Sequence, residues 1–157
     1  MRFSGRSSGA TAAAVIGLAT AGCSGATTDS GDPGEIVIVL SVSGGIAATD
    51  WQITIDGSRG VIVGDRCEGL NCDWGPGETL ATVTGDEISA LADQFVASGF
   101  FSGPREFGSQ CCDQFDYVLR YTDDDDDRDI QGSDGTLPER LRDLIDAVRR
   151  FVDEARV

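Results

Sequence analysis

The sequence predicts an α+β domain, an antiparallel sheet of about four to six strands with two helices packed on one face. Short segments that are β-branched or that alternate apolar and polar residues are separated by Gly-rich turns, which is typical of antiparallel strands. Two other segments carry apolar residues at helical spacing, each after a Thr-x-x-Glu capping box. Strands precede a helix twice along the chain, which favours this fold class over alternating βα units.

Four strands are expected before the first helix. Residues 35–42 are β-branched, apolar on both faces early on and end at a glycine pair, so they predict a central strand. Residues 51–55 alternate apolar and polar side chains and, with residues 61–64, predict a hairpin around the Gly-containing turn at 56–60. Residues 78–83 predict the fourth strand.

The first helix is expected to begin at the capping box formed by Thr84 and Glu87 and to end at Gly99. Phe100 and Phe101 follow directly, and such a pair is expected to close the core beneath the helix end. The apolar residues that fall on one face of this helix are Ile88, Leu91, Ala92, Phe95 and Val96.

A further strand is predicted at residues 115–121, with a return strand near residues 129–131. The acidic run at residues 123–127 lies between them. Its aspartates alternate as calcium ligands can, but Arg128 stands where an EF-hand loop needs Gly, so a solvated turn is expected. The last helix is expected after a second capping box at residues 136–139. Its apolar stripe comprises Leu141, Leu144, Ile145, Val148 and Val152.

The N-terminus predicts export. Arg2 and Arg6 precede an apolar run at residues 10–21 that is too short to cross a bilayer as a helix, and Cys23 follows. Residues 1–22 resemble the signal peptide of bacterial lipoproteins, which implies cleavage before Cys23 and a diacylglyceryl group on its thiol. An ordinary secretory signal cut after Ala21, without a lipid, is the alternative.

The remaining chain divides into a tether and a domain. Residues 23–34 comprise the lipidated cysteine and a polar segment expected to behave as a flexible coil. Residues 35–157 have the size of a single domain with its own core. The expected location is therefore the bacterial cell membrane, with a monomeric domain facing the periplasm or the cell exterior.

Charge and composition restrict the function. The net charge of −15 repels nucleic acid and anionic lipid headgroups, so no nucleic-acid partner is expected. The chain has no His and no Lys. It therefore lacks the commonest general base, the usual zinc ligand and the Schiff-base nucleophile. We expect a protein that binds rather than an enzyme, with no cofactor and no metal.

Four further cysteines predict disulfides, because an even number in an exported chain usually pairs. Cys67 and Cys72 bracket a short loop, and Cys111 and Cys112 are adjacent. The pairing stays open. Local closure of Cys67 with Cys72 would leave a rare vicinal bond, whereas crossed pairs would tie the two halves of the domain together. A four-thiolate zinc site is the alternative, although the spacing is not the usual paired C-x₂-C.

The sequence resembles the emfourin family, proteinaceous inhibitors of thermolysin-type metallopeptidases. The resemblance lies in residues 97–102, 116–121 and 133–138 with the leucines that follow, and in residues 43–45. Residues 57–76 form a longer segment than the family pattern has, and the family's usual His in the returning strand is missing. The chain also resembles a family of uncharacterised bacterial lipoprotein domains with the same helix exit, which implies no activity.

The candidate partner-binding residues are Ser43, Gly44, Gly45, Asp50 and Trp74. The first three could enter a protease cleft as a flat loop, and the Asp50 carboxylate could approach a catalytic zinc in the partner. Trp74 has two interpretations, an anchor on a partner or a lid over a core edge. The expected function is a lipid-anchored extracytoplasmic binding protein whose partner is a secreted metallopeptidase. The alternative is an envelope lipoprotein of structural role, with neither inhibitory nor enzymatic activity.

Overall fold

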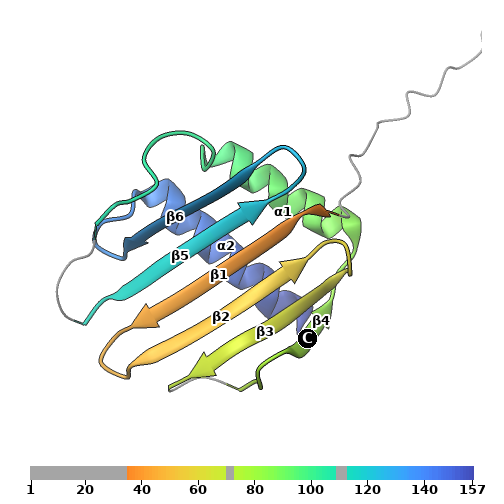
Figure 1. Cartoon of the computed structure of the whole chain (residues 1–157), viewed down its shortest axis with the longest axis horizontal. Coiled ribbons are helices and arrows are strands. Elements are labelled where there is room, and N and C mark those ends of the chain that lie inside the picture. Colours follow the sequence, from red (N-terminus) through yellow and green to blue (C-terminus); the bar gives the residue numbers. More distant parts are fainter. Residues whose placement is uncertain (1–34, 70–72, 109–112) are drawn as a thin grey trace, which may run out of the picture.

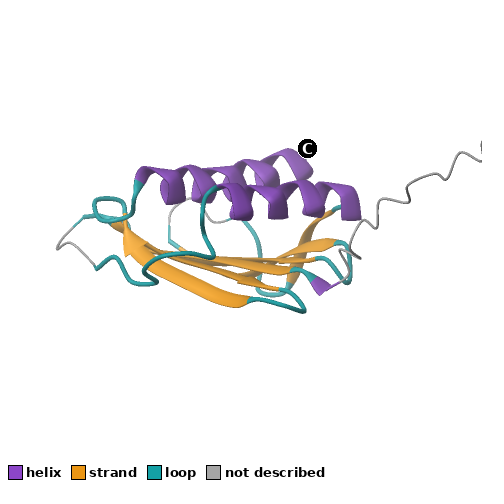
Figure 2. Cartoon of the chain, turned by 90° about the horizontal axis from the view of Figure 1, so that it is seen from above, coloured by secondary structure: helices purple, strands orange, loops and turns teal. Residues whose placement is uncertain are grey.

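A computed structural model describes residues 35–69, 73–108 and 113–157 (Figure 1). In this part of the chain, six strands form one antiparallel sheet and two helices lie side by side on one of its faces (Figure 2). This confirms the predicted α+β fold. The elements are β1 (Val37–Gly44), β2 (Thr49–Asp56), β3 (Val61–Glu68), β4 (Glu78–Thr82), α1 (Gly85–Ala97), β5 (Phe115–Thr122), β6 (Asp127–Ser133) and α2 (Glu139–Ala155).

The strand order is β4-β3-β2-β1-β5-β6, so the strand predicted to be central, β1, is central. It pairs along its whole length with both neighbours, and Leu40 lies between Ile53 and Leu119. The predicted β2–β3 hairpin is confirmed. Its ladder contains an irregularity at Asp65, whose carboxylate accepts hydrogen bonds from Gln52 and Thr54.

The core lies between the sheet and the two helices, because each strand turns alternate apolar side chains toward the helices. In β1 these are Ile38, Leu40 and Val42, each at most 2% exposed. The predicted stripe of α2 is buried throughout, from Leu141 to Val152. Further fully buried side chains come from the other elements: Ile55, Ile62, Ile88, Leu91, Phe95, Phe100, Leu119 and Ile130.

The first helix begins as predicted. The Thr84 hydroxyl accepts the backbone N–H of Glu87, and the Glu87 carboxylate accepts the backbone N–H of Thr84. These hydrogen bonds lower the pKa of Glu87 below its ordinary value. Phe100 is buried and packs edge-on against Phe95, so the Phe pair closes the core as expected. One stripe residue was predicted wrongly: Val96 is 69% exposed, because it lies beside the buried face at the end of α1.

The second capping box is wrong. Pro138 stands at the N-cap of α2 without a side-chain hydrogen bond to the helix. The Thr136 hydroxyl is engaged in the preceding turn, where it accepts the backbone N–H of Ser133 at 2.8 Å and donates to the Gly108 carbonyl at 3.0 Å. Tertiary contacts therefore engage the Thr136 hydroxyl, which the local sequence pattern predicted to cap the helix.

The acidic run forms the predicted turn between β5 and β6. The Asp123 carboxylate accepts the backbone N–H groups of Asp125 and Asp126 at 2.9 and 2.7 Å. Arg120 binds both oxygens of Asp127, at 2.8 and 2.9 Å. These hydrogen bonds explain why the acidic run forms a turn.

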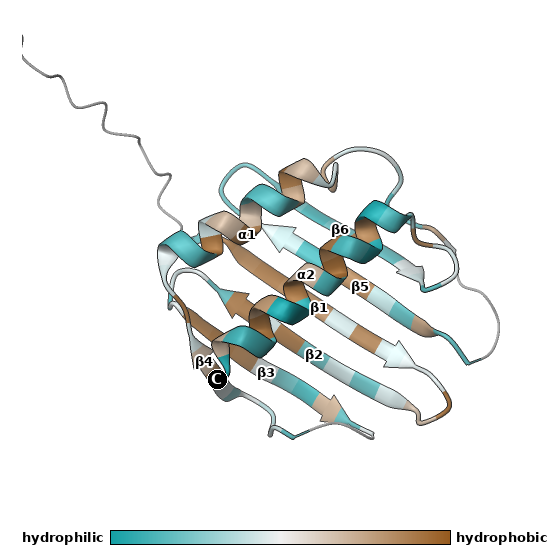
Figure 3. Ribbon diagram, turned by 180° about the vertical axis from the view of Figure 1, so that it is seen from behind, coloured by the Kyte–Doolittle hydropathy of each residue, from teal (hydrophilic) through white to brown (hydrophobic). Residues whose placement is uncertain are grey.

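The helices leave one corner of the sheet uncovered. In Figure 3, α2 crosses the sheet obliquely and ends near β3 and β4, while α1 lies over the opposite margin. No described helix lies over the end of the sheet at which β1 turns into β2. Neither α1 nor α2 is long and apolar enough to span a membrane. The uncovered corner positions the cleft described below.

Candidate functional site

Four of the five predicted contact residues lie together at the β1–β2 turn. Ser43 is paired with Asp50, and Gly44 with Thr49. The backbone N–H of Gly45 donates to the Gln114 carbonyl at 3.0 Å, which ties the turn to the segment that enters β5. The turn is therefore held from two sides, by its own ladder and by the neighbouring strand.

The glycine pair has a structural role in this turn. Gly44 and Gly45 have φ angles of 105° and 70°, in the left-handed region that favours glycine. A Cβ on Gly44 would lie 2.6 Å from the Gln114 carbonyl oxygen, and one on Gly45 would lie 2.9 Å from the Phe115 ring. Larger residues at these positions would displace the turn from β5, so they cannot test binding separately from folding.

The residue that the turn presents is Ile46, which sequence reasoning missed. Its side chain is 88% exposed, the most exposed large apolar side chain in the described part of the chain apart from the C-terminal Val157. A signal was present in the sequence, because a β-branched apolar residue directly after a glycine pair is unusual for a turn. The turn therefore places an aliphatic side chain in solvent.

Asp50 is an ion-pair partner within the sheet. Its carboxylate lies 2.8 Å from the Arg66 guanidinium on the neighbouring strand β3. Since side chains alternate along a strand, Asp50 and its neighbour Trp51 point to opposite faces, and Trp51 lies on the helix side. The Asp50 carboxylate thus already has a cationic partner.

Trp74 lies apart from the other predicted contact residues, in the loop before β4. Its indole N–H donates to the Arg66 carbonyl at 3.2 Å, and its ring meets that of Trp51 edge-on with centroids 6.1 Å apart. The ring is partly buried against the core cluster. This arrangement favours the interpretation of Trp74 as a lid over a core edge.

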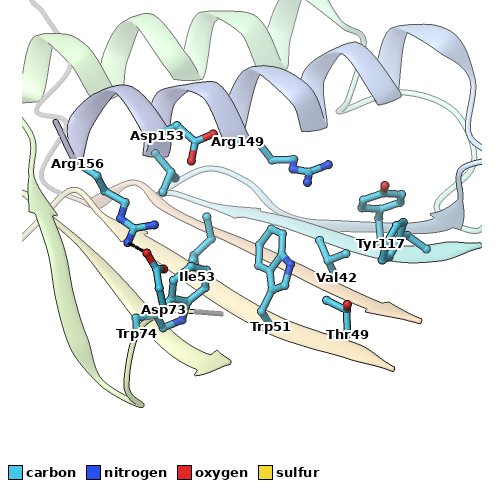
Figure 4. A pocket seen from close by; sticks show the side chains of 12 residues that line it. Val42, Thr49, Trp51, Ile53, Asp73, Trp74, Tyr117, Arg149, Asp153 and Arg156 are labelled. Atoms are coloured by element: carbon cyan, nitrogen blue, oxygen red, sulfur yellow. Dashed lines mark hydrogen bonds and ion pairs between the residues drawn. The ribbon is translucent and has the colours of Figure 1, made fainter. Parts of the chain in front are cut away.

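Beside this lid, the uncovered corner of the sheet forms a cleft of about 420 Å³ (Figure 4). Strands β1, β2 and β5 form its floor and α2 forms one wall. Both tryptophans of the chain line it. The complete lining is Val42, Thr49, Trp51, Ile53, Asp73, Trp74, Phe115, Tyr117, Arg149, Val152, Asp153 and Arg156.

Two arginines of α2 lie over the two indoles. The Arg156 guanidinium is 5.3 Å from the Trp74 ring centroid and 2.8 Å from the Asp73 carboxylate. The Arg149 guanidinium is 5.9 Å from the Trp51 ring centroid. Arg149 forms no ion pair within the described part of the chain. Stacking on an aromatic face suits guanidinium, which is weakly hydrated.

Tyr117 and Thr49 contribute uncharged polar side chains to the cleft. Burial raises the pKa of Tyr117, and a hydrogen bond to Asp134 raises it further, so the phenol stays neutral. Thr49 is only 8% exposed and lies on the floor of the cleft.

The structure leaves the cysteine predictions open. Cys67 lies in β3 opposite Trp51. Cys23, Cys72, Cys111 and Cys112 lie outside the described residues, so the lipid and the disulfide pairing remain predictions. Among the described residues, no group of three His, Cys, Asp or Glu side chains is placed to hold a metal ion.

No protein-family model matches this chain, and a search of curated proteins finds no match.

Proposed function

We propose that this protein is a lipid-anchored extracytoplasmic binding protein whose β1–β2 turn inhibits a thermolysin-type metallopeptidase. The observation that carries the binding role is Ile46, an aliphatic side chain 88% exposed at the tip of a braced turn. The class of partner comes from the resemblance of the sequence to the emfourin family. The location comes from the lipoprotein-like N-terminus.

Exposure alone does not support this role, because single exposed apolar residues are common on protein surfaces. The bracing of the turn supports it. The β1–β2 ladder runs up to Gly44, and Gly45 is bound to the Gln114 carbonyl. A side chain held on a rigid element loses little conformational entropy when it enters a partner's pocket, so more of its burial energy contributes to affinity.

The experiment is a titration of the full-length chain carrying Cys23→Ser, which removes the proposed lipid, against a thermolysin-type peptidase. Ile46→Asp should weaken inhibition by about tenfold or more, because burying an isoleucine contributes about 1.5–3 kcal/mol. The matched control is Val157→Asp, the same kind of change at another exposed β-branched residue. It should inhibit as the parent does.

Two outcomes contradict the proposal at different levels. No inhibition of any such peptidase at micromolar concentrations would remove the inhibitor role. Equal inhibition by the Ile46→Asp and parent proteins would show that the β1–β2 turn is not the contact surface. Circular dichroism of each variant should match that of the parent, because Ile46 and Val157 are both highly exposed.

A further inference from the structure

We propose that the cleft between α2 and the uncovered corner of the sheet binds a small carboxylate with an apolar body, such as a medium-chain fatty acid. The site is separate from the β1–β2 turn surface, and the inference does not depend on the inhibitor role.

The apolar part of the ligand is matched by the floor of the cleft. Val42 and Ile53 belong to the core face of the sheet and line the cleft, although each is only 2% exposed. The indoles of Trp51 and Trp74 form one side, edge to face. A volume of about 420 Å³ lies within the range of small-molecule sites, which are mostly apolar with a few convergent polar groups.

The carboxylate is matched by Arg149. Of the two arginines in the cleft, Arg156 is already neutralised by Asp73 at 2.8 Å. Arg149 has no ion-pair partner among the described residues, and Figure 4 shows its guanidinium extending into the cleft between Trp51 and Tyr117. A guanidinium presents N–H donors in a planar fork that fits a carboxylate.

Thr49 provides a second polar side chain in the cleft. Thr49 lies on the floor of the cleft and is 8% exposed. Figure 4 shows Thr49 below and Arg149 above the same space. A carboxylate between them could accept a hydrogen bond from each side chain.

Asp153 also lines the cleft and, like Arg149, has no ion pair among the described residues. It lies one turn of α2 from Arg149, and both residues are exposed to solvent, where the field of each is screened. The Tyr117 phenol is neutral and is engaged with Asp134. Arg149 is the cation of the cleft that has no ion-pair partner among the described residues, and an anion is the ligand that it selects.

The fluorescence of the protein tests this directly, because both of its tryptophans line the cleft. Octanoate, octanol and octylammonium share one tail and differ in charge, and each is titrated into the full-length Cys23→Ser protein. We expect saturable quenching or a blue shift with octanoate at the lowest concentration, a weaker response to octanol and the weakest to octylammonium. Equal responses to all three would overturn the carboxylate assignment.

Variants locate the contact. Arg149→Gln should weaken octanoate binding about tenfold, the effect of losing a hydrogen bond to a charged group, and should leave octanol binding unchanged. Arg150→Gln, the adjacent arginine of α2 outside the cleft, should bind octanoate as the parent does. Thr49→Val, which keeps the shape of the side chain, should weaken octanoate more than octanol. Unchanged octanoate binding by Arg149→Gln, or no response to octanoate below its micelle concentration, would overturn the proposal.

Discussion

The indole of Trp74 rests directly on Gly64, so closely that a Cβ on Gly64 would lie 2.2 Å from the ring. Gly64 is opposite Ile53 in the β2–β3 ladder and faces the helix side of the sheet. The missing side chain leaves space for the indole, whose N–H donates to the Arg66 carbonyl. The wall of the cleft therefore depends on one glycine in β3.

Gly64→Ala should displace Trp74, since the ring cannot stay in place beside a Cβ. We expect a loss of about 1–3 kcal/mol in the free energy of unfolding, the usual cost of overpacking. Tryptophan emission should shift to longer wavelength as the indole becomes more exposed. The control is Gly75→Ala in the same loop, where the nearest atom to an added Cβ is 3.7 Å away. Unchanged emission in Gly64→Ala would contradict this packing.

The acidic turn predicts a dependence of stability on pH. Burial acts to raise the pKa of Asp123, but hydrogen bonds from Asp126, the Tyr121 hydroxyl and Asp125 outweigh it and lower the pKa below its ordinary value. A pKa that is lower in the folded state stabilises the fold above the ordinary carboxyl pKa, and this contribution is lost as pH falls through the folded value. Asp123→Asn should therefore lower Tm at neutral pH, and the difference from the parent should shrink below about pH 4.

Asp124→Asn is the control for this measurement. It removes the same charge from the same run, and the Asp124 carboxylate accepts no hydrogen bond from the described residues. Thermal unfolding at several pH values should show little change or a slight gain in Tm for this variant, because it reduces repulsion in an acidic protein. Equal losses of Tm in the two variants would contradict the role of Asp123 as the centre of the turn.

The cysteines predict an oxidised domain. In the exported protein, Cys67, Cys72, Cys111 and Cys112 should form two disulfides, because thiols pair in an oxidising compartment. Mass spectrometry without reduction should show the loss of four hydrogens, and peptide mapping should give the pairing. Four thiols open to alkylation, or zinc bound after purification, would reject this prediction.

The N-terminus predicts lipidation at Cys23. Cys23→Ser should release the protein from the membrane fraction and abolish incorporation of labelled palmitate, because the thiol is the proposed attachment point. The control is the parent chain expressed in the same host. Membrane association that persists without Cys23 would favour the ordinary secretory signal combined with another means of attachment.

Local signals were sufficient for most of the fold. The capping box at Thr84 and the stripe from Leu141 to Val152 predicted the helices correctly, because the hydrogen bonds and periodicity involved span only a few residues. The central place of β1 followed from its apolar residues on both faces. The capping box predicted at Thr136 was wrong, because its hydroxyl forms hydrogen bonds with a distant segment and with the preceding turn.

The sequence by itself determined the class of the fold, the order of its elements and the position of the β1–β2 turn, because these depend on neighbouring residues. Only the tertiary structure decided what the surface offers. The oblique course of α2 leaves a corner of the sheet without a helix above it and brings Arg149 over Trp51, although the two residues are far apart in the sequence. The contact of the turn with β5 gives its glycines a structural role and leaves Ile46 in solvent. Such relationships depend on the angle at which packed elements cross, and no local sequence pattern encodes that angle.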